Sequence, residues 1–82
     1  MNKYVFIRMS ACKYRAYLRK NYDGSLDAGF LGIVHRVFYG GSGDLWEAFS
    51  PEGKLIGLAD KRNWAADMLF KRWEISHAES TF

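Results

Sequence analysis

The stretch DLWEAFSPEGKLIGLADKRNWAADMLFKRW, residues 44–73, decides the fold expected for this chain of 82 residues. Its first half contains two short runs that are rich in apolar side chains. Pro51 and Gly53 lie between them, where a tight turn favours proline and glycine. This arrangement predicts a hairpin of two antiparallel strands over residues 44–50 and 54–58.

The second half of the stretch has the spacing of an amphipathic helix over residues 60–74. Asp60 stands where an aspartate caps a helix by accepting hydrogen bonds from the unpaired amides of the first turn. The apolar side chains cover an arc of roughly 240°, whereas a helix on a small sheet needs only about 100°. They are Trp64, Ala65, Ala66, Met68, Leu69, Phe70 and Trp73. The excess predicts that another element, a second copy or another protein covers part of the helix.

The preceding part of the chain contributes further elements. Both faces of a predicted strand over residues 30–39 carry apolar groups, which is typical of a central strand or of one that meets a partner. Residues 3–9 predict an edge strand. Residues 11–22 fit a helix or a strand, and the helix is favoured because Ala, Leu, Lys and Arg predominate and β-branched residues are absent. Residues 40–43, GGSG, predict a flexible hairpin connection.

The expected fold class is α+β, with a three- to four-stranded antiparallel sheet packed against a C-terminal helix. The composition, with 49% hydrophobic, 17% aromatic and 26% charged residues, is typical of a globular chain. We expect residues 1–82 to form a single domain, in which residues 76–82 are a loose polar tail.

The residues that could support chemistry are few. Cys12 is the single cysteine, which excludes an internal disulfide and favours a reducing, cytoplasmic location. Cys12, His35 and His77 lack the spacing of a catalytic or metal-binding motif, and the GGSG loop lacks the lysine and the helix of a phosphate-binding loop. No secretory signal or run of about 20 apolar residues occurs. We therefore predict no enzymatic activity, no catalytic residue, no cofactor, no metal and no membrane contact.

Charge is distributed unevenly along the chain. Residues 1–22 contain six basic residues and no acidic residue, whereas residues 23–60 contain six acidic and two basic residues. This pattern allows a nucleic-acid surface, an acidic protein partner, or complementarity between two copies of the chain.

The aromatic side chains of the helix and the basic N-terminal segment form the predicted partner-binding site. Aromatic residues, methionine and arginine predominate at the centres of interfaces, and a cationic margin steers an acidic partner. The predicted partner-binding residues are Arg15, Tyr17, Arg19, Trp64, Met68, Phe70 and Trp73. We expect the chain to form a homodimer or an obligate complex with another protein, because the aromatic surface exceeds what a domain of this size hides.

Residues 45–69, LWEAFSPEGKLIGLADKRNWAADML, resemble the last two strands and the helix of two families that read DNA with a sheet. These families are the arm-binding N-terminal domain of phage tyrosine recombinases and the plant ethylene-response-type domain. In both, the sheet lies in the major groove and the helix packs behind it. The present sequence departs from them in carrying Glu47 and Glu52, and few arginines, where those families place their base and phosphate contacts.

In size, cysteine content and aromatic content, the whole chain is similar to small phage-encoded regulatory and inhibitor proteins of the antirepressor kind. That resemblance implies docking on a larger regulator. The expected function is therefore a non-enzymatic interaction protein that binds and modulates or inhibits a larger regulatory protein. The alternative is a sheet-type nucleic-acid-binding module that uses the basic N-terminal segment.

Overall fold

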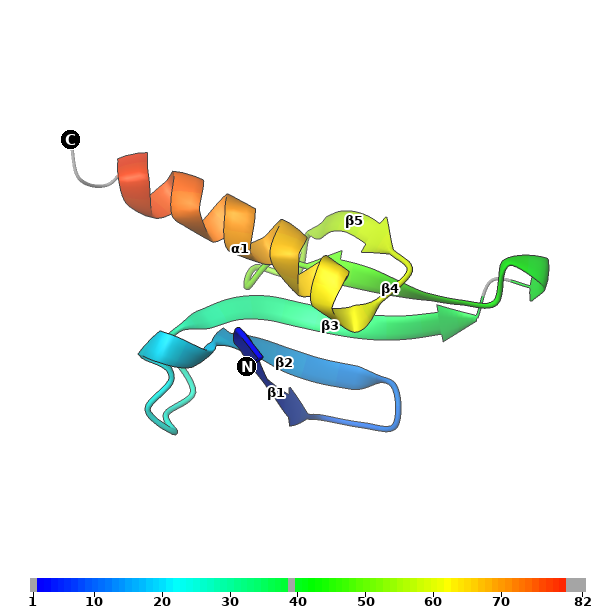
Figure 1. Cartoon of the computed structure of the whole chain (residues 1–82), viewed down its shortest axis with the longest axis horizontal. Helices are drawn as coiled ribbons and strands as arrows, with labels where there is room; N and C mark the ends of the chain where they lie inside the picture. Colours follow the sequence, from blue (N-terminus) through cyan, green and yellow to red (C-terminus); the bar gives the residue numbers. More distant parts are fainter. Residues whose placement is uncertain (1, 39, 80–82) are drawn as a thin grey trace.

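The computed structural model describes residues 2–38 and 40–79, and within them a five-stranded antiparallel sheet carries one helix on one face (Figure 1). The strands are β1 (Tyr4–Arg8), β2 (Lys13–Leu18), β3 (Phe30–Phe38), β4 (Asp44–Phe49) and β5 (Leu55–Ala59). They lie in the sheet in the order of the chain, and the helix α1 (Arg62–Glu79) packs on β3, β4 and β5. The predicted α+β class is confirmed, with five strands in place of three to four.

The helix favoured for residues 11–22 is wrong. The segment forms β2, followed by one turn of 3₁₀ helix, η1 (Arg19–Asn21). Strand β2 pairs with β1 on one side and with β3 on the other, and Ala16 lies between Phe6 and Gly32. Helix propensities differ by only a few tenths of a kcal/mol per residue, whereas burying one large apolar side chain contributes about 1.5–3 kcal/mol. Central placement in the sheet therefore outweighs the local preference.

The boundaries of α1 also differ from the prediction. The amide of Ala65 donates to the carbonyl of Lys61 (3.1 Å), so Lys61 occupies the cap position and Asp60 precedes it. In the described part of the chain the Asp60 side chain has no hydrogen bond to the first turn, and the predicted cap is wrong. The helix continues to Glu79, so residues 76–79 are helical where a loose tail was predicted. Residues 80–82 of that tail lie outside the described residues.

The turn signals of the sequence are confirmed between β4 and β5. The amide of Gly53 donates to the carbonyl of Ser50 (2.9 Å), and the amide of Lys54 donates to Ser50 Oγ (3.1 Å). Gly53 has φ of 91°, a conformation that glycine adopts without strain. The glycine-rich connection between β3 and β4 forms a short 3₁₀ turn, η2 (Gly40–Ser42). The predicted strand over residues 30–39 is confirmed as far as Phe38, and Tyr39 lies outside the described residues.

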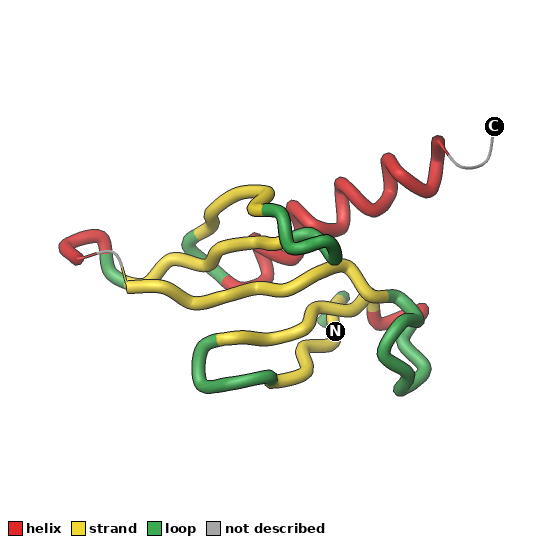
Figure 2. Tube along the Cα trace, turned by 180° about the vertical axis from the view of Figure 1, so that it is seen from behind, coloured by secondary structure: helices red, strands yellow, loops and turns green. Residues whose placement is uncertain are grey.

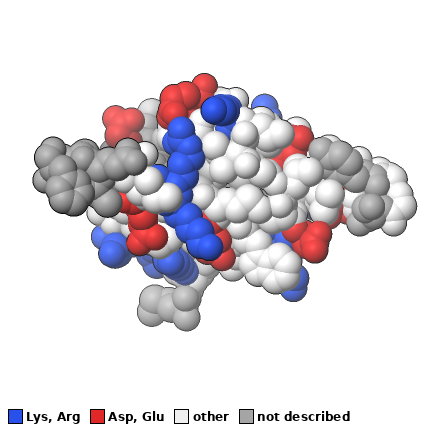
Figure 3. All heavy atoms as spheres, turned by 90° about the horizontal axis from the view of Figure 1, so that it is seen from above, with Lys and Arg blue, Asp and Glu red and all other residues white. Residues whose placement is uncertain are grey.

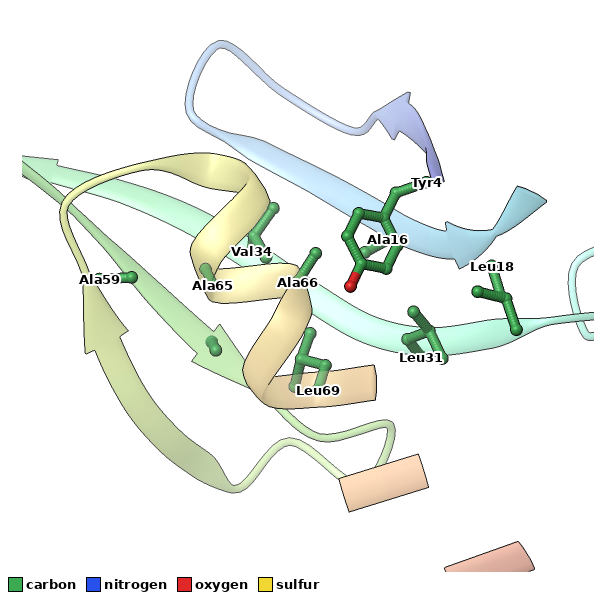
Figure 4. Packing of buried hydrophobic residues seen from close by; sticks show 10 residues of the cluster. Tyr4, Ala16, Leu18, Leu31, Val34, Ala59, Ala65, Ala66 and Leu69 are labelled. Carbon is green, nitrogen blue, oxygen red and sulfur yellow. The ribbon is translucent and has the colours of Figure 1, made fainter. Parts of the chain in front are cut away.

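Small residues occupy the centre of the core between the sheet and α1 (Figure 4). Ala65 and Ala66 of the helix are fully buried, and Gly32 of β3 lies against Leu69. A Cβ atom at Gly32 would come within 2.1 Å of the Phe49 carbonyl oxygen and 3.1 Å of Leu69 Cδ1. The small residues allow the helix to lie close to the sheet. Larger buried side chains, those of Tyr4, Leu18, Leu31 and Leu69, fill the rest of this core, and most of the other aromatic rings that contact it are only partly buried.

Candidate partner-binding site

A groove with a volume of about 370 Å³ lies between α1 and the N-terminal end of the sheet. Four elements meet there: the residues before β1, the end of β2, η1 and the middle of α1. The lining residues, which we call the basic groove, are Asn2, Lys3, Leu18, Arg19, Lys20 and Phe70. Three of them are cations and none is acidic, so the groove combines an apolar floor with a positively charged rim.

Phe70 forms the aromatic wall of the basic groove. Its ring is half-buried, lies edge-on to Tyr4 at 6.4 Å between centroids, and stacks on Trp73 at 6.0 Å. Lys3 Nζ lies 3.8 Å from the centre of the Phe70 ring, the geometry of a cation–π contact. An apolar group entering the groove would therefore meet an aromatic surface with a cation already beside it.

Arg19 shapes the rim of the groove. Its Nε donates to the carbonyl of Asn2 (2.7 Å), and one terminal nitrogen donates to the carbonyl of Tyr4 (3.1 Å). These bonds use two of the five N–H groups of the guanidinium, and the other three have no hydrogen-bond partner among residues 2–38 and 40–79. Lys20 is exposed beside it. The rim thus presents preorganised donors to an anionic group.

A hydrogen bond between the helix and β1 holds the two walls of the groove together. The Tyr4 ring is 2% exposed, and its hydroxyl donates to the Asp67 carboxylate on α1. Figure 4 shows this ring extending from β1 across β2 toward the helix. Burial, above all, raises the pKa of Tyr4 well beyond its usual range, and the hydrogen bond and the charges of Asp67 and Glu74 raise it further. Tyr4 therefore remains a neutral donor at all ordinary pH values.

The structure divides the predicted partner-binding residues among several surfaces. Arg19 and Phe70 both line the basic groove. Trp73 stacks on Phe70 but lines a neighbouring hollow of about 240 Å³ together with Arg72 and residues of β3 and the β4–β5 turn. Trp64 is 51% exposed at the start of the helix, with Lys61 Nζ 5.6 Å from the centre of its ring.

The other three predicted residues lie away from the groove. Met68 packs over Gly57 of β5, since a Cβ at Gly57 would lie 2.7 Å from the Met68 sulfur. Tyr17 is 1% exposed beneath the loop before β3, and its hydroxyl donates to the carbonyl of Leu26 (3.1 Å). Its predicted role at a contact surface is wrong, because a buried and hydrogen-bonded ring cannot meet a partner. Arg15 lies on the face of the sheet opposite the helix.

Sequence reasoning missed Lys3, Lys20 and Leu18 as members of the site. The two lysines belong to the basic N-terminal segment, but nothing in their spacing connects them to Phe70, fifty or more positions further on. In the folded chain, the pairing of Tyr4 with Leu18 places Lys3 beside the segment that contains Arg19 and Lys20. The packing of α1 on the sheet then brings Phe70 to the same place. A reading of residues 11–22 as a strand would have placed Leu18 on the face beneath the helix.

Among residues 2–38 and 40–79, no second helix or sheet packs on the face of the sheet opposite α1, as the two views of the chain show (Figures 1 and 2). Strand register places Leu58, Glu47, His35 and Lys13 in one row across this face. It places Phe49, Ile33, Arg15 and Ile7 in the next row. Val37 and Leu45 pair in a third row, on the other side of the row that contains His35. We call these ten residues the open face.

The charged groups of the open face differ between the two sides of β3. His35 Nδ1 lies 3.2 Å from Glu47 Oε1 on β4, and the two side chains are 32% and 19% exposed. On the other side of β3, β2 contributes the cations Lys13 and Arg15. A hollow of about 260 Å³ lies on this face, lined by Lys13, Ile33, His35, Phe49 and Gly53.

Cys12 and His35, two of the residues considered for catalysis from the sequence, do not lie on one surface of the sheet. The amide of Arg36 donates to the carbonyl of Cys12 (2.7 Å), whereas Lys13 pairs with His35. Strand alternation therefore directs Cys12 and His35 to opposite faces of the sheet. The side chain of His77 lies outside the described part of the molecule. Within the described residues, no three His, Cys, Asp or Glu side chains are grouped as a metal site would require.

Two further findings do not concern a single site. None of the helical residues in the described ranges forms a segment that is long and apolar enough to cross a membrane. Comparisons with protein-family models, with curated proteins and with solved structures found no match, so the resemblances to sheet-type DNA-binding domains and to phage regulators stay predictions.

Proposed function

We propose that the protein is a non-enzymatic interaction domain that binds an acidic segment of a larger regulatory protein and thereby modulates or inhibits that regulator. The observation that supports this proposal is the basic groove, in which a half-buried phenylalanine and three cations line one hollow. An aromatic wall offers the desolvated contact area on which binding energy concentrates. The cations select an anionic partner and raise its association rate.

The dimensions of the groove favour a short peptide segment. A volume of about 370 Å³ is at the lower end of the range of small-ligand pockets. It accommodates one large apolar side chain together with part of the adjoining backbone. Acidic residues on either side of that anchor would reach Lys3 and Lys20. The partner chemistry that fits is therefore an extended or helical segment with a Leu, Phe or Trp anchor flanked by Asp or Glu.

Nucleic-acid binding is less well supported, because folding separates the basic residues of the N-terminal segment. Lys13 and Arg15 lie on the open face, whereas Lys3 and Arg19 lie beside the helix. On the face seen in Figure 3, blue and red side chains are interspersed and separated by uncharged surface. A continuous basic field, which duplex binding requires, is not formed there.

Selection of peptides from a random displayed library on the immobilised protein tests the proposal. We expect enriched peptides to contain an apolar anchor between acidic residues. Lys20→Glu should weaken their binding by about tenfold, since like charges then meet across the contact. Lys71→Glu, the same change on the exposed side of α1, is the matched control and should leave affinity unchanged.

Two results would overturn the proposal. One is a selection that yields no acidic peptides, or peptides that bind the Lys20→Glu variant equally well. The other is a gel-shift assay in which DNA or RNA binds in preference to the peptides, with an affinity that falls steeply as salt increases. Circular dichroism of Lys20→Glu verifies that the fold is retained.

A further inference from the structure

We propose that the open face binds a second copy of this chain, with the two sheets face to face and a twofold axis running along β3. This surface is separate from the basic groove, so the inference goes beyond the proposed function. It concerns self-association, and its test needs no knowledge of the regulator.

The composition of the open face supports an interface. Six of its ten residues are apolar: Ile7, Ile33, Val37, Leu45, Phe49 and Leu58. Ile7 and Leu58 are 39% and 44% exposed, which leaves their apolar area in water. An antiparallel sheet that faces water normally carries polar side chains on that side. Here only four of the ten residues are polar, three of them in one row and Arg15 in the next, so a second apolar surface is the cover that suits the face.

The charges decide which orientation of the second copy fits the open face. A twofold axis in the interface plane can run along the strands or across them. An axis along β3 places β2 of one copy over β4 of the other, so Lys13 faces Glu47 of the second copy. An axis across the strands places β2 over β2, so Lys13 and Arg15 face the same cations. The first arrangement sets Lys13 against an acidic group and Arg15 against Phe49. It is favoured because the second arrangement brings like charges together across the interface, which is strongly unfavourable.

The same axis is compatible with the apolar residues. Ile33 and Val37 lie on β3 and would meet their own copies near the axis, as the centre of an isologous interface requires. Two sheets packed in this way lie ~10 Å apart with strands inclined by roughly 30°. The helices would remain on the two outer surfaces. Each dimer would consequently carry two basic grooves that face away from the interface.

The area of the open face sets the expected strength of the dimer. Neighbouring strands lie ~4.8 Å apart and each residue rises ~3.4 Å, so a five-stranded face presents roughly 400–500 Å². Two copies would bury roughly 1,000 Å², at the lower end of specific interfaces, which corresponds to a weak dimer with a micromolar dissociation constant. Association should therefore be measured over roughly 1–300 µM protein.

Sedimentation velocity and light scattering of the unmodified protein and three variants test the arrangement. We expect the unmodified protein to dimerise, and Lys13→Glu or Glu47→Lys alone to raise the dissociation constant by about 100-fold, since each variant places like charges at both symmetric contacts. An equimolar mixture of the two variants should dimerise again, because both contacts then join a lysine to a glutamate. Lys71→Glu, outside the open face, is the matched control and should dimerise normally.

Several outcomes would overturn the proposal. A protein that is monomeric at roughly 300 µM has no such interface of micromolar strength. A dimer that survives both substitutions uses another surface, and a mixture that stays monomeric contradicts the axis along β3. Lys13 is exposed, so Lys13→Glu retains the fold and carries the test alone should Glu47→Lys fail to fold.

Discussion

Replacing Tyr4 with phenylalanine isolates the hydrogen bond that joins β1 to α1. The ring is 2% exposed and packs against Phe6 and Phe70, and phenylalanine preserves this packing while deleting the hydroxyl. The deleted bond ends on a charged carboxylate, a class that contributes about 1.5–3 kcal/mol. Because Asp67 is exposed and regains water, we expect the lower end, a loss of about 1.5 kcal/mol in the free energy of unfolding.

The difference in unfolding free energy between the unmodified protein and the Tyr4→Phe variant should also depend on pH, which provides a second, independent measure of this hydrogen bond. Burial, the Asp67 hydrogen bond and the charges of Asp67 and Glu74 raise the folded-state pKa of Tyr4 above the value of about 10 of an unfolded tyrosine. The stability contributed by this group is thus complete below about pH 10 and falls as pH rises, because the unfolded chain loses its proton first. The fall approaches about 1.4 kcal/mol per pH unit, and the Phe variant lacks it.

Urea denaturation of both proteins, followed by tryptophan fluorescence and far-ultraviolet circular dichroism between about pH 7 and about pH 11, measures the effect. The other tyrosines titrate in both proteins and cancel in the difference. We expect the advantage of the unmodified protein to shrink above about pH 10. Equal stabilities at neutral pH, or a difference that stays constant through the alkaline range, would refute the role assigned to Tyr4.

Two glycine substitutions separate a rigid contact from an adaptable one. Gly32→Ala should lower the free energy of unfolding by about 3 kcal/mol or more, because Gly32 has φ of 143° and the new methyl meets a backbone carbonyl oxygen at 2.1 Å. Gly57→Ala should cost less than about 1.5 kcal/mol, since the atom met at 2.7 Å is the sulfur of Met68, whose flexible side chain can move aside. Urea titration measures both changes, and a Gly57→Ala loss as large as that of Gly32→Ala would contradict this distinction.

The sequence indicates which residue types the candidate site contains, but it does not indicate which of these residues are accessible together. Phe70 and Arg19 were selected because interfaces favour these residue types, and the structure places both in the basic groove. Tyr17 also belongs to a residue type that interfaces favour. It is nevertheless buried, because β2 lies inside the sheet and the following loop covers its ring. Residue type indicates what a side chain can bind, whereas burial by distant segments decides whether it is accessible.

Local patterns in the sequence determined the β4–β5 hairpin, the strand β3 and the existence of a C-terminal helix. Their signals act within a few residues: the Pro51 and Gly53 turn, the alternation of apolar side chains, and helical spacing. Only the tertiary structure decided that residues 13–18 form a strand, since their helix-favouring composition was overridden by pairing on both sides. It also created the basic groove, whose walls are tied by a hydrogen bond between residues 63 positions apart, Tyr4 and Asp67. Contacts of that separation depend on how the elements pack, and no short-range pattern in the sequence encodes them.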